Sequence, residues 1–221
     1  MQLKVDRSET LRYLGYKGGY IPEDVEKMLT ECMEKIEEIS NIRYVYKVFN
    51  LDEVTLKGND ITNHLEGCQK CILMAATIGM ETDDYVKKMQ VKDMTRAVML
   101  DACGSSAIEN VCNLVEEILR EQFEYKGMYV TKRFSPGYGD MPIEQQREMC
   151  NLLDAQRKIG IYITDGNMII PVKSVTAVLG ISKTKPKNEA SENSKCDSCN
   201  LKESCKYKLE YGKDGRTNCG E

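Results

Sequence analysis

The residues best suited to binding chemistry form the segment Arg133-Phe-Ser-Pro-Gly-Tyr138. The planar guanidinium of Arg133 matches a carboxylate through paired hydrogen bonds, and Tyr138 offers a flat apolar face with a polar tip. Pro136 and Gly137 predict a turn whose backbone a ligand can approach closely. Such a segment suits a small ligand of amino-acid or nucleoside character. The same residue types also fit an ordinary turn beside a surface arginine, so the pattern alone leaves both interpretations open.

A second group of chemically competent residues lies near the C-terminus, where four of the ten cysteines are found: Cys196, Cys199, Cys205 and Cys219. Two thiolates separated by two residues can chelate one metal ion, and further thiolates can complete a tetrahedral site. The spacing matches neither a zinc ribbon nor a bacterial ferredoxin. The tail can therefore carry an iron–sulfur cluster, a zinc ion or unliganded thiols.

The elements that must position these residues predict an α+β fold. Runs rich in aromatic, β-branched or apolar residues predict strands at residues 43–49, 54–56, 71–78, 128–133, 159–164 and 175–181. Apolar residues at helical spacing predict helices at residues 22–39, 82–122 and 142–157, the second of them broken near Val91. Because the strands are clustered and do not alternate regularly with helices, we expect a mainly antiparallel twisted sheet with long helices.

Length and charge limit the domain organisation and the function class. The 221 residues fit one domain at 1–182, a polar linker at 183–195 and a short cysteine-rich tail at 196–221. A net charge of −4 without a basic block argues against nucleic-acid binding. No apolar run is long enough to cross a membrane, and the first residues lack an apolar signal segment. We therefore expect a soluble cytoplasmic protein with no nucleic-acid or membrane partner.

The segment Arg133–Tyr138 resembles the R-x-x-P-G-Y motif of the activation domain of cobalamin-dependent methionine synthase. Segments similar to that family stand in the same order around it: Leu65-Glu-Gly-Cys68, Ala75-Ala-Thr-Ile-Gly79, residues 100–109 and residues 168–180. The resemblance extends over about residues 8–182. The family's N-terminal acidic contact to the ligand amine and its C-terminal helical extension have no counterpart that can be placed in this sequence.

The resemblance implies a binding site for S-adenosylmethionine. It implies that Arg133 holds the ligand carboxylate and that Glu109 and Asp101 are the candidates for the amine or the ribose. It also implies that Tyr138 lines the site, next to Pro136 and Gly137, where the backbone allows close approach. No residue is expected to act as a general acid or base.

The resemblance also implies a role. The family reactivates oxidised cobalamin by one-electron reduction coupled to methyl transfer from S-adenosylmethionine. Because this sequence shows no cobalamin-, folate- or homocysteine-binding module, we expect a stand-alone activation subunit. It would serve, in trans, the corrinoid-binding module of a methyltransferase, with a low-potential electron donor, and a cluster in the tail would fit that electron transfer. The rival interpretation is a metal-bearing docking or electron-transfer protein of the same fold that does not bind S-adenosylmethionine.

The single histidine, His64, lies in Thr62-Asn-His-Leu-Glu-Gly67, which is similar to the D-x-H-x-x-G corrinoid signature with threonine in place of aspartate. That aspartate orients the imidazole that ligates cobalt, a role that threonine fills poorly. No glycine-rich corrinoid segment follows. We therefore interpret the match as coincidental and expect cobalamin to be presented by the partner.

Overall fold

The computed structural model describes residues 3–16 and 18–184, together with the backbone of residues 209–211 and 217–219. Its elements are, in chain order, α1 (Arg7–Tyr13), α2 (Glu23–Ile39), β1 (Arg43–Asn50), a 3-10 turn (Leu51–Glu53), α3 (Asn59–His64), β2 (Lys70–Thr77), α4 (Met80–Lys92), α5 (Met94–Glu124), β3 (Tyr129–Val130), α6 (Gln145–Leu153), α7 (Ala155–Ile159), β4 (Tyr162–Ile163), β5 (Ile169–Ile170), β6 (Ser174–Ser182), β7 (Leu209–Tyr211) and β8 (Thr217–Cys219).

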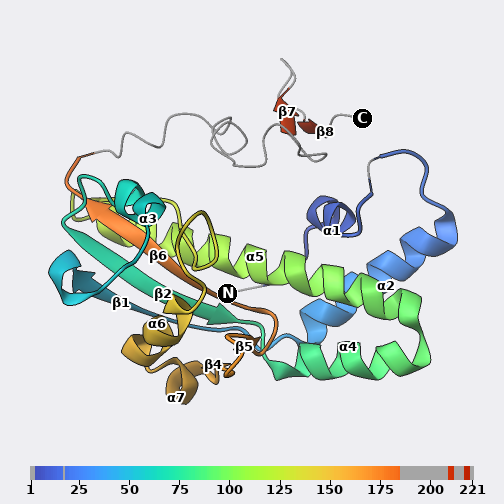
Figure 1. Cartoon of the computed structure of the whole chain (residues 1–221). Coiled ribbons are helices and arrows are strands. Elements are labelled where there is room, and N and C mark those ends of the chain that lie inside the picture. Colours follow the sequence, from blue (N-terminus) through green and yellow to red (C-terminus); the bar gives the residue numbers. More distant parts are fainter. Residues whose placement is uncertain (1–2, 17, 185–208, 212–216, 220–221) are drawn as a thin grey trace.

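A four-stranded sheet in the order β1-β2-β6-β3 forms the centre of the fold (Figure 1). All of its pairings are antiparallel, and β2 pairs with β6 from Lys70, opposite Ile181, to Thr77, opposite Ser174. Residues 71–77 are buried throughout, which explains the unbroken apolar run of β2. The predicted strand with both faces covered is confirmed.

Helices cover both faces of this sheet. α5 lies across one face and packs with α1, α2 and α4, whereas α6 and α7 lie on the opposite face (Figure 1). The side chains of β2 alternate accordingly between two cores. Ile72, Met74 and Ala76 pack with α5, and the intervening residues, such as Leu73, pack with α6 and α7. This arrangement confirms the predicted α+β class.

The long helix α5 positions most of the candidate site. Asp93 caps its N-terminus, because the Asp93 carboxylate accepts a hydrogen bond from the backbone N–H of Arg96. Asp93 also separates α4 from α5, which confirms the predicted break near Val91. Within the helix, Gly104 leaves room for the aliphatic part of the Lys173 side chain to pack against α5, since a Cβ added there would lie 3.1 Å from Lys173 Cε.

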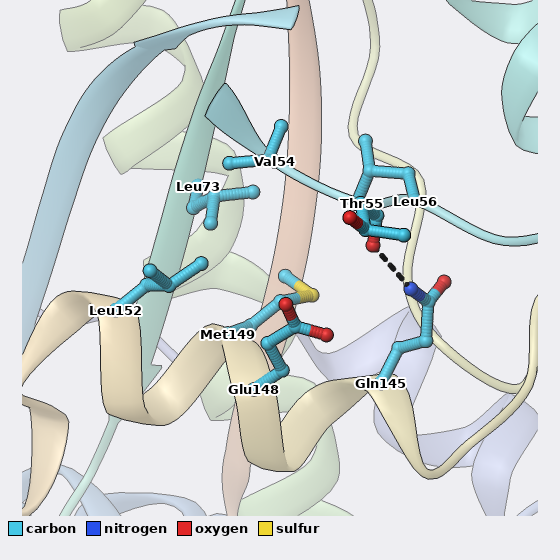
Figure 2. Close-up of a pocket in the computed structure, with 8 residues that line it drawn as sticks. All are labelled: Val54, Thr55, Leu56, Leu73, Gln145, Glu148, Met149 and Leu152. Atoms are coloured by element: carbon cyan, nitrogen blue, oxygen red, sulfur yellow. Dashed lines mark hydrogen bonds between the residues drawn. The ribbon is translucent and has the colours of Figure 1, made fainter. Parts of the chain in front are cut away.

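The predicted strand at residues 54–56 is wrong. The side-chain amide of Gln145 takes the backbone groups that a neighbouring strand would need, donating to the carbonyl of Thr55 and accepting from the N–H of Lys57, each at 2.8 Å. Figure 2 shows the contact with Thr55 beside a cavity of about 10 Å³ between this segment and α6. Such a volume holds one water molecule at most, so this region is a packing contact between the two segments and not a ligand site.

Other predicted elements are divided or shorter. The helix expected at 142–157 is divided into α6 and α7, because Asp154 adopts a left-handed conformation with φ of 56°. α7 ends at Ile159, so the strand expected at 159–164 is reduced to β4. The strand expected at 128–133 is reduced to β3 by a bulge that follows it.

The tail contributes one antiparallel pairing, β7 with β8. The remainder of the expected linker and tail, residues 185–208, 212–216 and 220–221, lies outside the described residues. Over the part of the chain that is described, none of the helices combines the length and the apolar character that crossing a membrane requires.

Candidate functional site

A β-bulge aims Arg133 at α5. Val130 of β3 lies opposite Ile181 of β6, so a regular ladder would place Arg133 opposite Val178. Instead Phe134 lies opposite Val178 and exchanges both backbone hydrogen bonds with it at 2.8 Å. The β3 side therefore has one residue more than the strand it faces. As a result Phe134 packs in the core under α6, and Arg133 turns towards α5.

Side chains of α5 receive the guanidinium of Arg133. Its Nη2 lies 2.6 Å from Oε2 of Glu109, and its Nη1 lies 2.7 Å from Oδ1 of Asn113 and 3.1 Å from Oε2 of Glu116. These partners follow one another at four and three residues, so they form one stripe of the helix. Glu109 was predicted from the resemblance, whereas Asn113 and Glu116 were not, although this spacing is visible in the sequence.

The ion pair is partly shielded from solvent. The side chain of Arg133 is 21% exposed, that of Glu116 is 13% exposed and that of Glu109 is 36% exposed. Burial opposes the charge of Arg133, but the carboxylates of Glu109 and Glu116 keep its pKa above the usual value. Burial raises the pKa of the neighbouring Cys112 thiol to about 12, so this thiol stays protonated. The site thus combines a fixed cation with carboxylates, of which Glu109 is the more accessible.

An open depression of about 490 Å³ lies beside the ion pair, lined by Asn113, Glu116, Glu117, Arg120 and Lys132. Asn113 and Glu116 both contact Arg133, so the depression borders the guanidinium. Small-molecule sites usually have volumes of about 300–1,000 Å³. The depression is therefore large enough for a small ligand, and its lining is polar.

The backbone fixes the loop that follows Arg133 (residues 134–140, the motif loop). Pro136 is buried, and Gly137 has φ of 90°, which glycine adopts without strain. A Cβ added at Gly137 would lie 3.1 Å from Cδ1 of Ile143, so the end of that exposed side chain would have to shift slightly. Tyr138 is 66% exposed. Pro136 and Gly137 thus form the turn, and Tyr138 stands at the surface.

Asp101 lies apart from Arg133. The helical rise separates it from Glu109 by about 12 Å along α5. Its Oδ1 lies 2.8 Å from Nζ of Lys173, a side chain that is 10% exposed and also donates to the hydroxyl of Ser105 at 2.9 Å. The structure therefore brings Glu109, but not Asp101, to the guanidinium of Arg133.

α1 brings a further aromatic residue, Tyr13, towards the site. This residue was not predicted from the sequence. The N-cap residue of α1, Asp6, exchanges two hydrogen bonds of 3.1 Å through its backbone with the hydroxyl of Ser106, which lies one turn before Glu109 on α5. At the other end of α1, burial and then the charge of Glu109 raise the pKa of Tyr13. The signal for α1 is Asp6-Arg-Ser-Glu9, a sequence typical of a helix N-terminus.

The cysteine-rich tail stays a prediction. Cys196, Cys199 and Cys205 lie outside the described residues, and only the backbone of Cys219 is described, at the end of β8. Among the residues whose side chains are described, 3–16 and 18–184, no group of three or more His, Cys, Asp or Glu side chains is placed to hold a metal ion.

Comparisons with known proteins identify the family and the fold of this chain. Residues 52–191 match the model of the family described as "Vitamin B12 dependent methionine synthase, activation domain". A comparison with curated proteins finds no match. Among solved structures, the crystal structure of the MetH reactivation domain bound to AdoHcy matches with a TM-score of 0.61 and 15% identity, over 82% of this chain and 75% of that chain. At this identity the structural likeness establishes the fold. The family match covers more than half of the chain and includes α5 and the motif loop, and we conclude that the chain belongs to the family of vitamin B12-dependent methionine synthase activation domains.

Proposed function

We propose that this activation domain binds S-adenosylmethionine at the Arg133–Glu109 pair and supports reductive methylation of oxidised cobalamin on a separate corrinoid-binding methyltransferase. The observation that carries the proposal is the position of the pair. A half-buried guanidinium lies 2.6 Å from a more exposed carboxylate, at the start of the motif loop and beside an open depression.

The pair is complementary to the methionine end of this ligand. An α-amino acid carries a carboxylate and an ammonium on one carbon, so Arg133 can bind the first while Glu109 binds the second. The protein ion pair is then exchanged for ligand ion pairs, and no half-buried charge loses its partner. Glu116, which is 13% exposed, holds Nη1 at 3.1 Å and can keep the guanidinium in place during the exchange.

Other residues have roles that follow from their positions. Asp101 is too far along α5 to share the amine with Glu109, so we assign it to a ribose hydroxyl. Tyr138, which is 66% exposed, supplies an aromatic face, and Pro136 and Gly137 shape the backbone beneath it.

Methyl transfer from a sulfonium requires positioning and not acid–base catalysis. The reduced corrinoid of the partner supplies the electron pair for the methyl carbon, while the carbon–sulfur bond breaks and S-adenosylhomocysteine leaves. The residues of this chain hold the methionine moiety and aim its methyl group. The single electron that precedes this step comes from a low-potential donor, for which the tail cysteines, as an iron–sulfur cluster, are a candidate route.

One observation favours the rival function, a metal-bearing docking or electron-transfer protein that does not bind the ligand. Glu109, Asn113 and Glu116 already bind Arg133, so the guanidinium has protein partners without a ligand. In that case the pair serves only to join β3 to α5.

Calorimetric titration separates these functions. The wild-type protein should release or absorb heat with S-adenosylmethionine and with S-adenosylhomocysteine, and Glu109→Gln should weaken both, because the amide lacks the charge that binds the ammonium. No heat at millimolar ligand would favour the rival. A mixture of the protein, a Co(II) corrinoid protein, a low-potential reductant and S-adenosylmethionine should then regenerate methylcobalamin, visible in its absorption spectrum.

A further inference from the structure

The bulge that turns Arg133 towards α5 changes the hydrogen bonding of the β3 edge. The N–H of Thr131 still donates to the carbonyl of Gly180 at 3.0 Å. In return, the N–H of Gly180 donates to the hydroxyl oxygen of Thr131 at 2.8 Å. A side chain therefore replaces a backbone acceptor at the residue where the regular ladder stops. The carbonyl of the next residue, Lys132, is bonded by side chains and not by β6.

α3 supplies the partner of that carbonyl. Nε2 of His64, the last residue of α3, lies 2.8 Å from the carbonyl oxygen of Lys132 and 3.0 Å from the hydroxyl oxygen of Thr131. A carbonyl can only accept, so Nε2 carries the proton and donates. The imidazole also packs against Phe134, with ring centroids 5.3 Å apart. His64 thus contacts the residues on both sides of Arg133.

The opposite end of α3 holds the far end of the motif loop. The carboxylate of Asp140 accepts hydrogen bonds from the backbone N–H groups of Asn59, at 2.7 Å, and Asp60, at 2.9 Å. The carboxylate of Asp60 accepts one from the N–H of Asp140 at 3.1 Å. α3 is therefore bonded to the chain just before Arg133 and again at the end of the motif loop.

We infer that α3 is the positioning element of the Arg133 site and that His64 is a positioning residue, which acts by holding the bulge at Lys132. A regular ladder would turn the side chain of Arg133 to the α6 face, away from Glu109. The His64 imidazole stabilises the irregular register because its Nε2 contacts both the Lys132 carbonyl and the Thr131 hydroxyl, which takes the place of a ladder acceptor. Its consequence for ligand binding rests on the proposed function, but its effect on the Arg133–Glu109 contact does not.

The test distinguishes the packing of the His64 ring against Phe134 from the hydrogen bond that the ring donates to the Lys132 carbonyl. His64→Gln keeps a donor without the ring, and His64→Phe keeps a ring against Phe134 without the donor. With ¹⁵N-labelled arginine, the ion-paired guanidinium of Arg133 should give slowly exchanging NMR signals, assigned by their loss in Arg133→Lys. These signals should persist in His64→Gln and broaden or disappear in His64→Phe and His64→Ala.

Ligand affinity gives a second readout. S-adenosylmethionine should bind about three- to tenfold more weakly to His64→Phe than to His64→Gln, since Thr131 still donates to the Lys132 carbonyl at 3.0 Å. Val86→Ala, in α4 and away from α3 (Figure 1), controls for lost stability and should leave the Arg133 signals intact. Unchanged Arg133 signals in both His64→Phe and His64→Ala would overturn the inference. If the wild type binds no ligand, the proposed function fails, and the NMR comparison still decides the role of His64.

Discussion

Nη2 of Arg133 and Oε2 of Glu109 lie 2.6 Å apart, joining residues that are 24 positions apart in the sequence. One partner follows a two-residue strand at the sheet edge, and the other lies in the middle of a 31-residue helix. Neither residue sits in a deep cavity. The pair is therefore a preformed, partly buried contact in which each charge already has a partner, as the proposed exchange with a zwitterion requires.

Replacing the arginine should abolish most ligand affinity. Arg133→Ala should weaken S-adenosylmethionine binding by about 2–5 kcal/mol, because a partly desolvated, charge-assisted contact is lost. Arg133→Lys should restore only part of it, since an ammonium cannot reproduce the guanidinium fork. Arg157→Ala, which removes an arginine paired with Asp154 on the other face of the sheet, is the matched control and should bind normally. Equal dissociation constants for wild type and Arg133→Ala in calorimetry would contradict the assignment.

The close approach of the motif loop to α3 should make one glycine indispensable. Gly139 has φ of 52°, and a Cβ there would collide with the carboxylate of Asp60. Gly127 has φ of 69° but no atom within 4 Å of an added Cβ. Gly127→Ala should therefore cost about 1–2 kcal/mol of unfolding free energy from backbone strain alone. Gly139→Ala should cost roughly a further 1–3 kcal/mol, measured by urea denaturation. Equal losses would show that α3 can move away freely.

The only histidine should give the protein a measurable pH dependence. Burial lowers the pKa of His64, and the Lys132 carbonyl and the charge of Glu116 oppose this only in part. At about pH 6 the unfolded chain, with a histidine pKa of about 6.5, therefore binds more protons than the folded chain. The free energy of unfolding should therefore decrease as the pH falls from about 6.5 through the lower pKa that His64 has in the folded protein.

His64→Gln isolates this contribution, because glutamine does not titrate and the chain has no other histidine. The melting temperature of wild type relative to His64→Gln should fall between pH 7.5 and pH 5 when both are scanned in matched buffers. A difference that stays constant over this interval would mean that the folded pKa of His64 is not depressed.

The tail should carry a metal when the protein is purified without oxygen. Visible charge-transfer absorption with matching iron and sulfide would identify a cluster, and colourless stoichiometric zinc would identify a structural site. Cys196→Ser combined with Cys199→Ser should remove either one, whereas Cys68→Ser, outside the tail, should not. Metal-free protein with titratable tail thiols would leave these cysteines without the proposed role.

The periodicity of the sequence was enough for the long elements. α2, β1, β2, α5 and β6 were predicted close to their observed bounds, because each buries a regular stripe or a continuous apolar run. The strand at 54–56 failed for a reason that no local pattern contains, since Gln145, about 90 residues away, takes its backbone groups. The same holds for the division of the helix at Asp154, which a single left-handed residue produces.

The sequence indicated some of the residues of the candidate site but not how they are arranged in space. The motif segment indicated Arg133 and the turn at Gly137, and the resemblance added Glu109. Asn113 and Glu116 escaped notice because their spacing has meaning only once the arginine is known to face α5. That orientation depends on the bulge, and the bulge depends on a contact from α3 that is distant in sequence.

The extra residue between Val130 and Phe134 bears on which face of the sheet this arginine occupies, because successive side chains of a strand point to opposite faces. A relative that lacks the extra residue could pair regularly, with its phenylalanine still opposite the counterpart of Val178 and its arginine, opposite that of Leu179, still facing α5. A relative that lacks two residues there would place the arginine opposite the counterpart of Gly180, on the α6 face. An alignment gap of two in this stretch, and not a gap of one, would therefore separate family members that keep the ligand site from members that keep only the scaffold.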